Sequence, residues 1–188
     1  MAGVGGQGIL TIAAALGYAS LAENMHVKQS EVHGMSQRGG AVQSHFRISD
    51  KPVASDLIPS GNADLILSVE PMESLRYLPY LCDDGWLVTN SVPFVNISQY
   101  PEIEIIKEAV TTFQKHIWID ADSIAKEVGS TKFSNMVMLG AAASFIHLEK
   151  ESLRKGIRMI FGKKGDEVVE ANLMAFEAGL AEASRQLS

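Results

Sequence analysis

The sequence predicts one α/β domain spanning residues 1–188, a Rossmann-like three-layer fold with a mostly parallel sheet, an antiparallel hairpin excursion and a helical C-terminus. Three observations predict it. A glycine-rich turn at residues 3–8 leads into a long apolar helix, short apolar runs alternate with helices, and the closing third has helical spacing. A chain of 188 residues suits one domain and buries roughly 70% of its unfolded surface, so it needs no disulfide or metal to stabilise its core.

The first half predicts a helix over 9–23, a short strand over 26–32, a turn over 34–40 and a strand over 41–48. The residues of the 41–48 strand alternate in character, as expected of a strand. Val42, Ser44, Phe46 and Ile48 form one set, and Gln43, His45 and Arg47 form the other. Only Met1 and Ala2 precede the glycine turn, which a strand should precede. Either the first strand is missing from the sequence as given, or it is built differently.

The second half predicts strands over 63–69, 85–90 and 116–119, and a helix over 71–78 that begins with a proline. Residues 92–101 read as irregular. A nearly uncharged helix follows over 134–147, with Ser134 as its N-cap. Two closing helices are marked by apolar residues at helical spacing: Leu153, Ile157 and Ile160, then Val169, Leu173, Phe176 and Leu180.

Charge and cysteine content exclude several functions. The 16 Lys and Arg against 22 Asp and Glu give a net charge of −6, which is unfavourable for general nucleic-acid binding. The single cysteine, Cys82, cannot form an intrachain disulfide, a four-cysteine zinc site or an iron–sulfur cluster. We expect a reducing, cytoplasmic location and any redox centre on another chain. His33 and His45 lack metal-ligand spacing with any acid, so no metal site is predicted.

Residues 1–22 carry no charge, and their length would fit a membrane span or a signal peptide. The segment nevertheless contains five glycines and several polar residues, and no basic region precedes it. We therefore expect a buried helix behind a glycine turn and no association with membranes.

Gly3, Gly5 and Gly8 fit the pattern G-x-G-x-x-G and stand directly before a helix. Amides at a helix N-terminus favour an anion, here a diphosphate. A nucleoside triphosphatase is excluded because Ile9 and Leu10 stand where a P-loop needs Lys and Ser or Thr. A structural turn in a non-catalytic scaffold remains open. So does a free-standing NAD-binding oxidoreductase, in which Glu31, 23 positions after Gly8, would bind the ribose.

Residues 30–40 form a second polar motif, Ser-Glu-Val-His-Gly-Met-Ser-Gln-Arg-Gly-Gly, between two predicted strands. Arg38 beside Gly39 and Gly40 has the composition of a second anion contact. A plain hairpin connection with a solvated Arg38 explains the same residues, and composition alone does not separate the two.

Together, the motifs at 3–8 and 30–40, followed by Val-Gln-Ser-His-Phe-Arg at 42–47, resemble the gamma-type subunit or domain of the 2-oxoacid:ferredoxin oxidoreductases. The sequence of residues 31–40 is most similar to that of the beta subunit of indolepyruvate ferredoxin oxidoreductase. Further matches extend the resemblance over nearly the whole chain: Pro59, Ala63-Asp64, Glu70-Pro71, and the runs at 135–140 and 172–179.

The resemblance implies a subunit of an enzyme that decarboxylates a 2-oxoacid, indolepyruvate or another aryl pyruvate, on thiamine diphosphate. Such enzymes pass electrons through iron–sulfur clusters to ferredoxin and release an acyl-CoA. This chain has neither a Gly-Asp-Gly thiamine motif nor cluster cysteines. Thiamine diphosphate, Mg and 4Fe-4S clusters are therefore expected on a larger partner subunit, and the chain is expected to be inactive alone.

The resemblance also implies contacts with coenzyme A. Carried onto this sequence, the cofactor-binding residues are Gly3, Gly5, Gly6, Gln7 and Gly8 in the loop, Gln37 or Arg38 in the hairpin, and Asn135 and Asn172 later in the chain. Plainer alternatives stay open, with Asn135 assisting an N-cap and Asn172 lying on a helix surface. Gly179 is expected to allow close helix packing. No catalytic residue is predicted.

Overall fold

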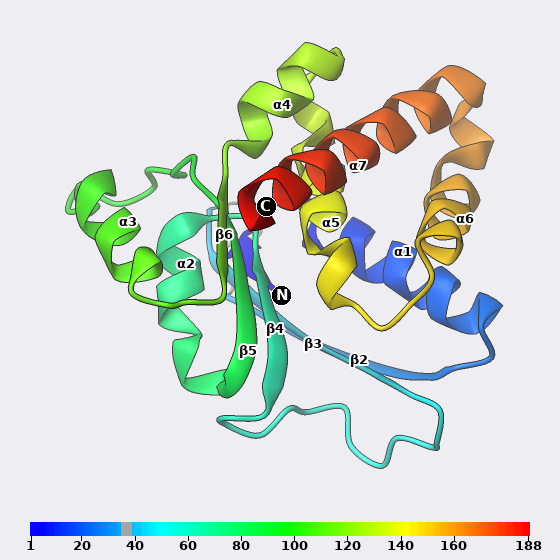
Figure 1. The fold of residues 1–188 in the computed structure, drawn as a ribbon, viewed down its shortest axis with the longest axis horizontal. Helices are drawn as coiled ribbons and strands as arrows, with labels where there is room; N and C mark the ends of the chain where they lie inside the picture. The colour runs from blue at the N-terminus through cyan, green and yellow to red at the C-terminus, as the bar shows by residue number, and fades with distance from the viewer. Residues whose placement is uncertain (35–38) are drawn as a thin grey trace.

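A computed structural model describes residues 1–34 and 39–188 of the chain (Figure 1). Its six-stranded sheet has the order β2-β3-β1-β4-β5-β6. The strands are β1 (Ala2–Val4), β2 (His26–His33), β3 (Ala41–Ser49), β4 (Ala63–Ser68), β5 (Leu81–Asn90) and β6 (His116–Ile119). The α/β architecture predicted from the sequence is confirmed.

A short strand, β1, does precede the glycine turn, and it lies in the middle of the sheet. β1 contains the first glycine and is three residues long, and it pairs parallel to β4 with Ala2 opposite Ser68. β4, β5 and β6 continue the parallel part. β3 pairs antiparallel to β1, and β2 pairs antiparallel to β3. The antiparallel excursion predicted for this hairpin is confirmed.

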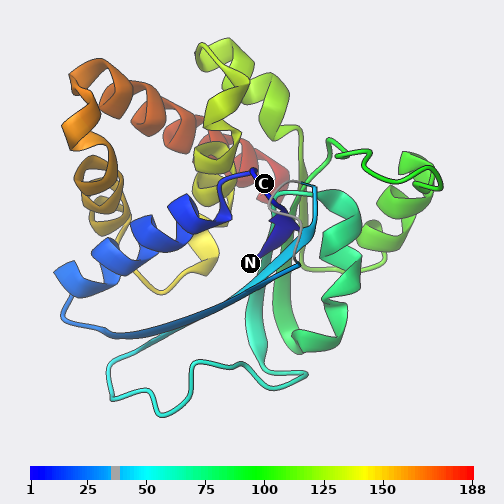
Figure 2. The ribbon, with the colours of Figure 1, turned by 180° about the vertical axis from the view of Figure 1, so that it is seen from behind.

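Helices cover both faces of the sheet (Figures 1 and 2). On one face lie α1 (Ile9–Ala22), α5 (Ser134–Ala142), α6 (Lys150–Phe161) and α7 (Asp166–Leu187), with α4 (Ala121–Val128) beside α5 and α7. On the other lie α2 (Pro71–Arg76) and α3 (Ile103–Thr111). The result is three layers, as the sequence predicts.

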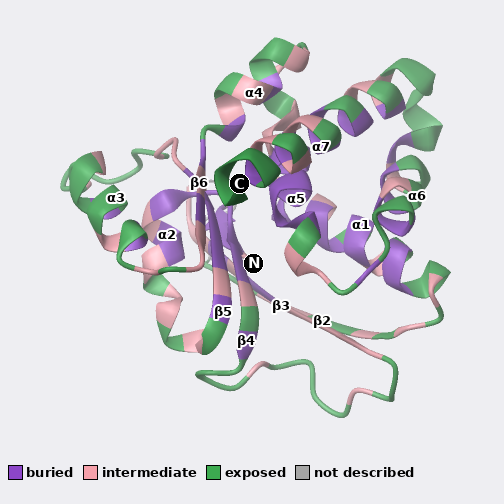
Figure 3. Ribbon diagram, in the orientation of Figure 1, coloured by how far each residue is buried: buried purple, intermediate pink, exposed green. Residues whose placement is uncertain are grey.

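The strands alternate their side chains between two cores. Leu67, Val88 and Ile117 belong to the larger core, under α1, α5, α6 and α7. Ile66 and Leu87 point the other way, into a smaller core with residues of α3. α5 is buried from Asn135 to Ala142 (Figure 3), which explains why its sequence carries no charge.

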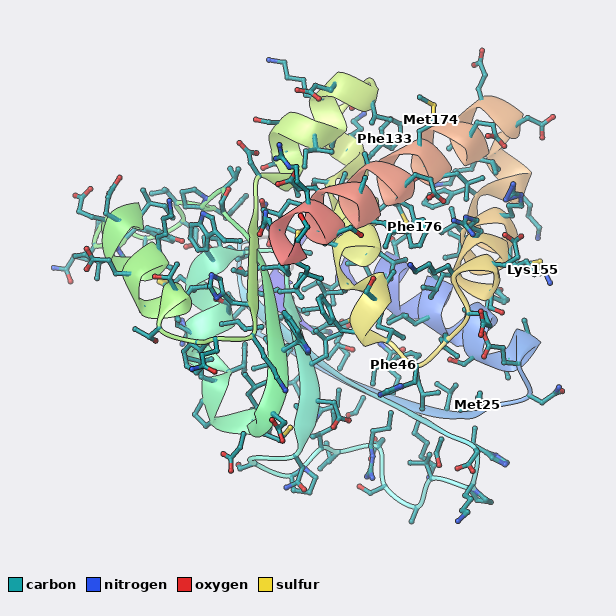
Figure 4. All side chains as sticks on the ribbon, in the orientation of Figure 1. Met25, Phe46, Phe133, Lys155, Met174 and Phe176 are labelled. Atoms are coloured by element: carbon teal, nitrogen blue, oxygen red, sulfur yellow. The ribbon has the colours of Figure 1, made fainter. Side chains whose placement is uncertain are left out.

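Two glycines let α5 and α7 pack in backbone contact. A Cβ on Gly179 would lie 1.9 Å from the Val137 carbonyl oxygen, and a Cβ on Gly140 would lie 1.9 Å from that of Phe176. Phe176 is fully buried in the larger core, on the α7 helix that crosses α5 (Figure 4). The packing role expected of Gly179 is confirmed, and it fixes where the start of α5 lies.

Several boundaries differ from the sequence prediction. Ser134 is the first residue of α5 and Phe133 is its N-cap, so the N-cap prediction is wrong. The helix ends at Ala142 and a 3-10 turn follows, so the predicted single helix to residue 147 is too long. β5 begins at Leu81, and the helices α3 and α4 were not predicted. Both are short and their amphipathic patterns cover few turns.

A groove of about 430 Å³ opens beside the C-terminal end of α1 and the turn after α5. Its lining is mostly apolar and includes Phe145 together with Met25 and Phe46, which are labelled in Figure 4. Every helix within residues 1–34 and 39–188 is too short or too polar to span a lipid bilayer. The uncharged segment at the start of the chain forms β1, the glycine loop and α1, whose inner face is buried, as expected.

Candidate functional site

The carboxyl ends of β1, β4 and β5 meet at one edge of the sheet, where α/β proteins bind ligands. Hydrogen bonds tie the three ends together. The Val69 carbonyl oxygen, just after β4, accepts from Gln7 Nε2 at 3.3 Å and from Asn90 Nδ2 at 3.4 Å. The loop that follows β1 is thereby held against the ends of its two neighbours.

The glycine loop turns sharply between β1 and α1. Gly6 and Gly8 have φ angles of 101° and 82°, which favour glycine. Gly5 donates its N–H to the Gly40 carbonyl and accepts from the Gly39 N–H, so the loop lies beside the end of the β2–β3 hairpin. The Gln7 side chain folds back and accepts from the Val4 N–H at 2.8 Å. Gln7 therefore shapes the loop from within.

The start of α1 presents open hydrogen-bond donors. No described residue accepts a hydrogen bond from the N–H groups of Gly6, Gly8, Ile9 or Leu10. Gly8, the N-cap, has no side chain to satisfy them, and the first turn of α1 carries no acidic residue. Unpaired amides and the positive end of a helix dipole favour an anion, and the diphosphate expected from the sequence stays a prediction.

Asn135, at the start of α5, contacts the same loop. Its side-chain amide donates to the Gly8 carbonyl at 3.4 Å, and the residue is 9% exposed. A Cβ on Gly8 would lie 2.5 Å from Asn135 Nδ2. Gly8 and Asn135 thus form one tight contact between α1 and α5, and only glycine fits the Gly8 position.

Gly3 has a packing role inside β1. A Cβ there would lie 2.3 Å from Val69 Cγ2 and 3.0 Å from Gln7 Oε1. The first glycine of the pattern therefore leaves room for the side chains of Val69 and Gln7.

Asn172 lies in a different place from Asn135. It is 2% exposed, and its side-chain amide donates to the Val168 carbonyl of its own helix at 2.7 Å. It precedes Gly179 by seven residues, or roughly 10 Å along α7. Its hydrogen bond stabilises α7, and a coenzyme contact by Asn172 stays a prediction.

Gln37 and Arg38 lie outside the described residues. Their neighbours Gly39 and Gly40 bond to Gly5, so this end of the hairpin adjoins the glycine loop.

Glu31 does not lie where an NAD-binding fold needs its acid. It stands on β2 opposite Ser44, and β3 separates β2 from β1. Two strand spacings are about 10 Å. In an NAD-binding fold the ribose-binding acid ends the next strand along the chain, which lies beside β1; here the next strand, β2, is separated from β1 by the antiparallel β3. Glu31 Oε2 is buried without a hydrogen-bond partner among the described residues.

Glu70 was not predicted as a site residue, although the Glu70-Pro71 pair belongs to the family resemblance. Glu70 is fully buried at the end of β4. Its Oε2 accepts from the Glu73 N–H at 2.8 Å, and its Oε1 accepts from the Phe94 N–H at 3.2 Å and from the Tyr100 hydroxyl. A polar residue directly after an apolar strand run was the available signal.

Two groups near Glu70 have shifted pKa values. Burial raises the pKa of the Glu73 carboxyl, and the Arg76 guanidinium opposes this shift only in part. Burial and the hydrogen bond to Glu70 raise the pKa of the Tyr100 hydroxyl, so it stays a donor at neutral pH. Across the ranges 1–34 and 39–188 no cluster of three or more His, Cys, Asp and Glu is placed to hold a metal.

Residues 1–182 match the family described as pyruvate ferredoxin/flavodoxin oxidoreductase. A subunit of indolepyruvate oxidoreductase from Pyrococcus horikoshii is 39% identical over 196 aligned positions, covering 99% of this chain and 95% of that protein. The gamma subunit of a keto/oxoacid ferredoxin oxidoreductase from Geobacter sulfurreducens superposes with a TM-score of 0.71 at 24% identity, covering 98% and 96% of the two chains.

A larger enzyme contains the same fold. The 2-oxoglutarate:ferredoxin oxidoreductase from Magnetococcus marinus, solved with 2-oxoglutarate, coenzyme A and succinyl-CoA bound, superposes with a TM-score of 0.75 at 23% identity. This chain corresponds to 30% of that one. The family match over nearly the whole chain agrees with the resemblance first seen in the glycine and hairpin motifs, and the chain belongs to the pyruvate ferredoxin/flavodoxin oxidoreductase family.

Proposed function

We propose that the chain is a subunit of a 2-oxoacid ferredoxin oxidoreductase and binds the charged end of coenzyme A at its glycine loop. The observation that carries the proposal is the set of amides of Gly6, Gly8, Ile9 and Leu10, which have no hydrogen-bond partner among the described residues and lie at the open edge of the sheet. Coenzyme A carries a diphosphate, the type of anion that such amides favour. The larger Magnetococcus enzyme with coenzyme A bound supports the choice of ligand.

In this proposal, thiamine diphosphate, Mg and 4Fe-4S clusters belong to a larger partner subunit, through which ferredoxin receives electrons. The single cysteine of the chain supports that division. The relative from Pyrococcus supports indolepyruvate or another aryl pyruvate as substrate. The chain would then hold the coenzyme while its thiol reaches the partner's reaction centre, giving no activity alone.

Exposed apolar side chains near this edge support contact with a partner. Leu10 in the first turn of α1, and Phe94, Val95 and Ile97 after β5, are at least two-fifths exposed. Permanent complexes cover such surfaces. Leu10 carries the last of these amides, so a partner docked on its side chain would close the coenzyme site.

A pair of glycine variants tests the proposal in the assembled enzyme. Gly6→Ala introduces strain at a φ of 101° without a steric clash, and Gly61→Ala does the same at 71° in a turn before β4. We expect Gly6→Ala to raise the KM for coenzyme A about tenfold, since misplacing phosphate-binding amides costs about 1.4 kcal/mol. Gly61→Ala should leave that KM unchanged. Equal KM values for both variants would refute the proposed site.

A further inference from the structure

Glu70 is a buried carboxylate that serves three donors. Its Oε2 caps α2 through the Glu73 N–H, and its Oε1 receives the Phe94 N–H and the Tyr100 hydroxyl. Phe94 and Tyr100 lie in the segment 91–101 between β5 and α3, which contains no helix or strand. The carboxylate therefore holds both the middle and the end of a segment that has no regular hydrogen bonding of its own.

The tip of this segment contacts the hairpin. Asn96 Nδ2 donates to the Gly39 carbonyl, and the Phe94 ring lies 4.0 Å from the position of a Gly39 Cβ. Gly39 in turn donates to the Gly5 carbonyl. An unbroken path of hydrogen bonds and one covalent segment thus runs from Glu70, through residues 94–96 and Gly39, to Gly5 in the glycine loop.

We propose that Glu70 is a positioning residue for the coenzyme site, acting by holding segment 91–101 against the hairpin and, through Gly39, fixing the glycine loop. The inference rests on the proposed function. The donors to the Glu70 carboxylate are the Glu73 N–H, the Phe94 N–H and the Tyr100 hydroxyl, none of which belongs to the glycine loop. The role of Glu70 is to keep the loop's donors in the orientation that the coenzyme phosphates need, so it should affect coenzyme binding more than turnover.

The Glu70→Gln variant tests this role because it removes one of the two acceptor oxygens and changes the side chain little in size. Glutamine has one acceptor oxygen where glutamate has two. If that oxygen serves Phe94 and Tyr100, an NH₂ group faces the Glu73 N–H. If it serves Glu73, the NH₂ group faces the Phe94 N–H. Either way a backbone N–H loses its partner. Asn96→Ala cuts the same path at the tip and leaves the α2 cap intact.

The assembled enzyme should be assayed with each variant and with both combined. We expect Glu70→Gln to raise the KM for coenzyme A about fivefold, the effect of one lost hydrogen bond, with kcat within about twofold of wild type. Asn96→Ala should raise the same KM. The double variant should match the larger single effect, because both changes break one path. An unchanged KM in Glu70→Gln, or effects that multiply, would overturn the proposal.

Chymotrypsin cleavage after Phe94 gives a readout that does not depend on activity. Glu70→Gln should speed cleavage of segment 91–101 relative to wild type. Cleavage at the wild-type rate would contradict the holding role of Glu70. If Gly6→Ala leaves the KM for coenzyme A unchanged, the proposed coenzyme site fails, and cleavage still decides whether Glu70 holds the segment.

Discussion

The side-chain amide of Asn135 lies against Gly8, with Nδ2 3.4 Å from the Gly8 carbonyl oxygen and 2.5 Å from the position that a Cβ on Gly8 would take. This contact joins the start of α5 to the start of α1, 127 residues apart. The glycine loop is therefore shaped by the packing of the whole helical layer as well as by its own sequence.

Gly8→Ala should destabilise the protein by about 1–3 kcal/mol, because alanine must adopt a φ of 82° and displace the Asn135 amide. Gly17→Ala is the matched control in the same helix, where a Cβ meets no atom within 4 Å. It should stabilise the protein by about 0.5–1 kcal/mol. Urea unfolding measures both, and a Gly8→Ala protein as stable as wild type would contradict the contact.

Gly179→Ala should cost about 3 kcal/mol or more, since its Cβ would lie 1.9 Å from the Val137 carbonyl oxygen. The backbones of α5 and α7 would have to separate. Gly162→Ala has a free position for its Cβ and should change the free energy of unfolding little. Similar unfolding midpoints for the two variants would mean that α5 and α7 do not pack in this way.

Gln7→Glu should weaken coenzyme A binding more than it weakens the fold. A glutamate retains the acceptor for the Val4 N–H, but it turns a carboxylate oxygen toward the Val69 carbonyl and places a negative charge in the loop. Gln7→Ala loses both hydrogen bonds without adding charge and should cost about 1–2 kcal/mol of stability. Calorimetric titration of the assembled enzyme should rank coenzyme affinity as wild type, Gln7→Ala, then Gln7→Glu. The reverse order of the two variants would argue against a phosphate at this loop.

The stability of wild type relative to Glu73→Gln should fall as the pH rises above 4.5, the ordinary pKa of a glutamate. Burial raises the pKa of Glu73 in the folded protein, so the folded state binds this proton more tightly than the unfolded chain does. Stability from this group is therefore fully present below that pH and is lost as the carboxyl ionises. Thermal unfolding between pH 4 and pH 7 measures the difference. A constant difference would show that Glu73 is not destabilised by burial.

Much of the fold was predictable from local patterns. The strand His116–Ile119 and the starts of α1, α2 and β4 follow directly from apolar runs and the proline at residue 71. The prediction of Ser134 as the N-cap of α5 was wrong. A 3-10 turn from Thr131 to Phe133 leads directly into the helix, so Ser134 already lies within it. A single residue type cannot reveal such a continuous turn.

The candidate site was predictable only in part. The glycine pattern located the open amides, and the family resemblance located Asn135 beside them. The role of Glu70 could not be predicted, because its partners Phe94 and Tyr100 lie 24 and 30 residues away in an irregular segment. The ribose role considered for Glu31 fails for a similar reason, since only the sheet order reveals that β3 lies between it and β1.

Hydrogen–deuterium exchange of the assembled enzyme, with and without coenzyme A, tests the central claim most directly. The account predicts that coenzyme A slows exchange at the amides of Gly6, Gly8, Ile9 and Leu10, the donors without a partner among the described residues. Saturating coenzyme A that leaves exchange at these amides unchanged, while slowing it elsewhere in the enzyme, would contradict the account.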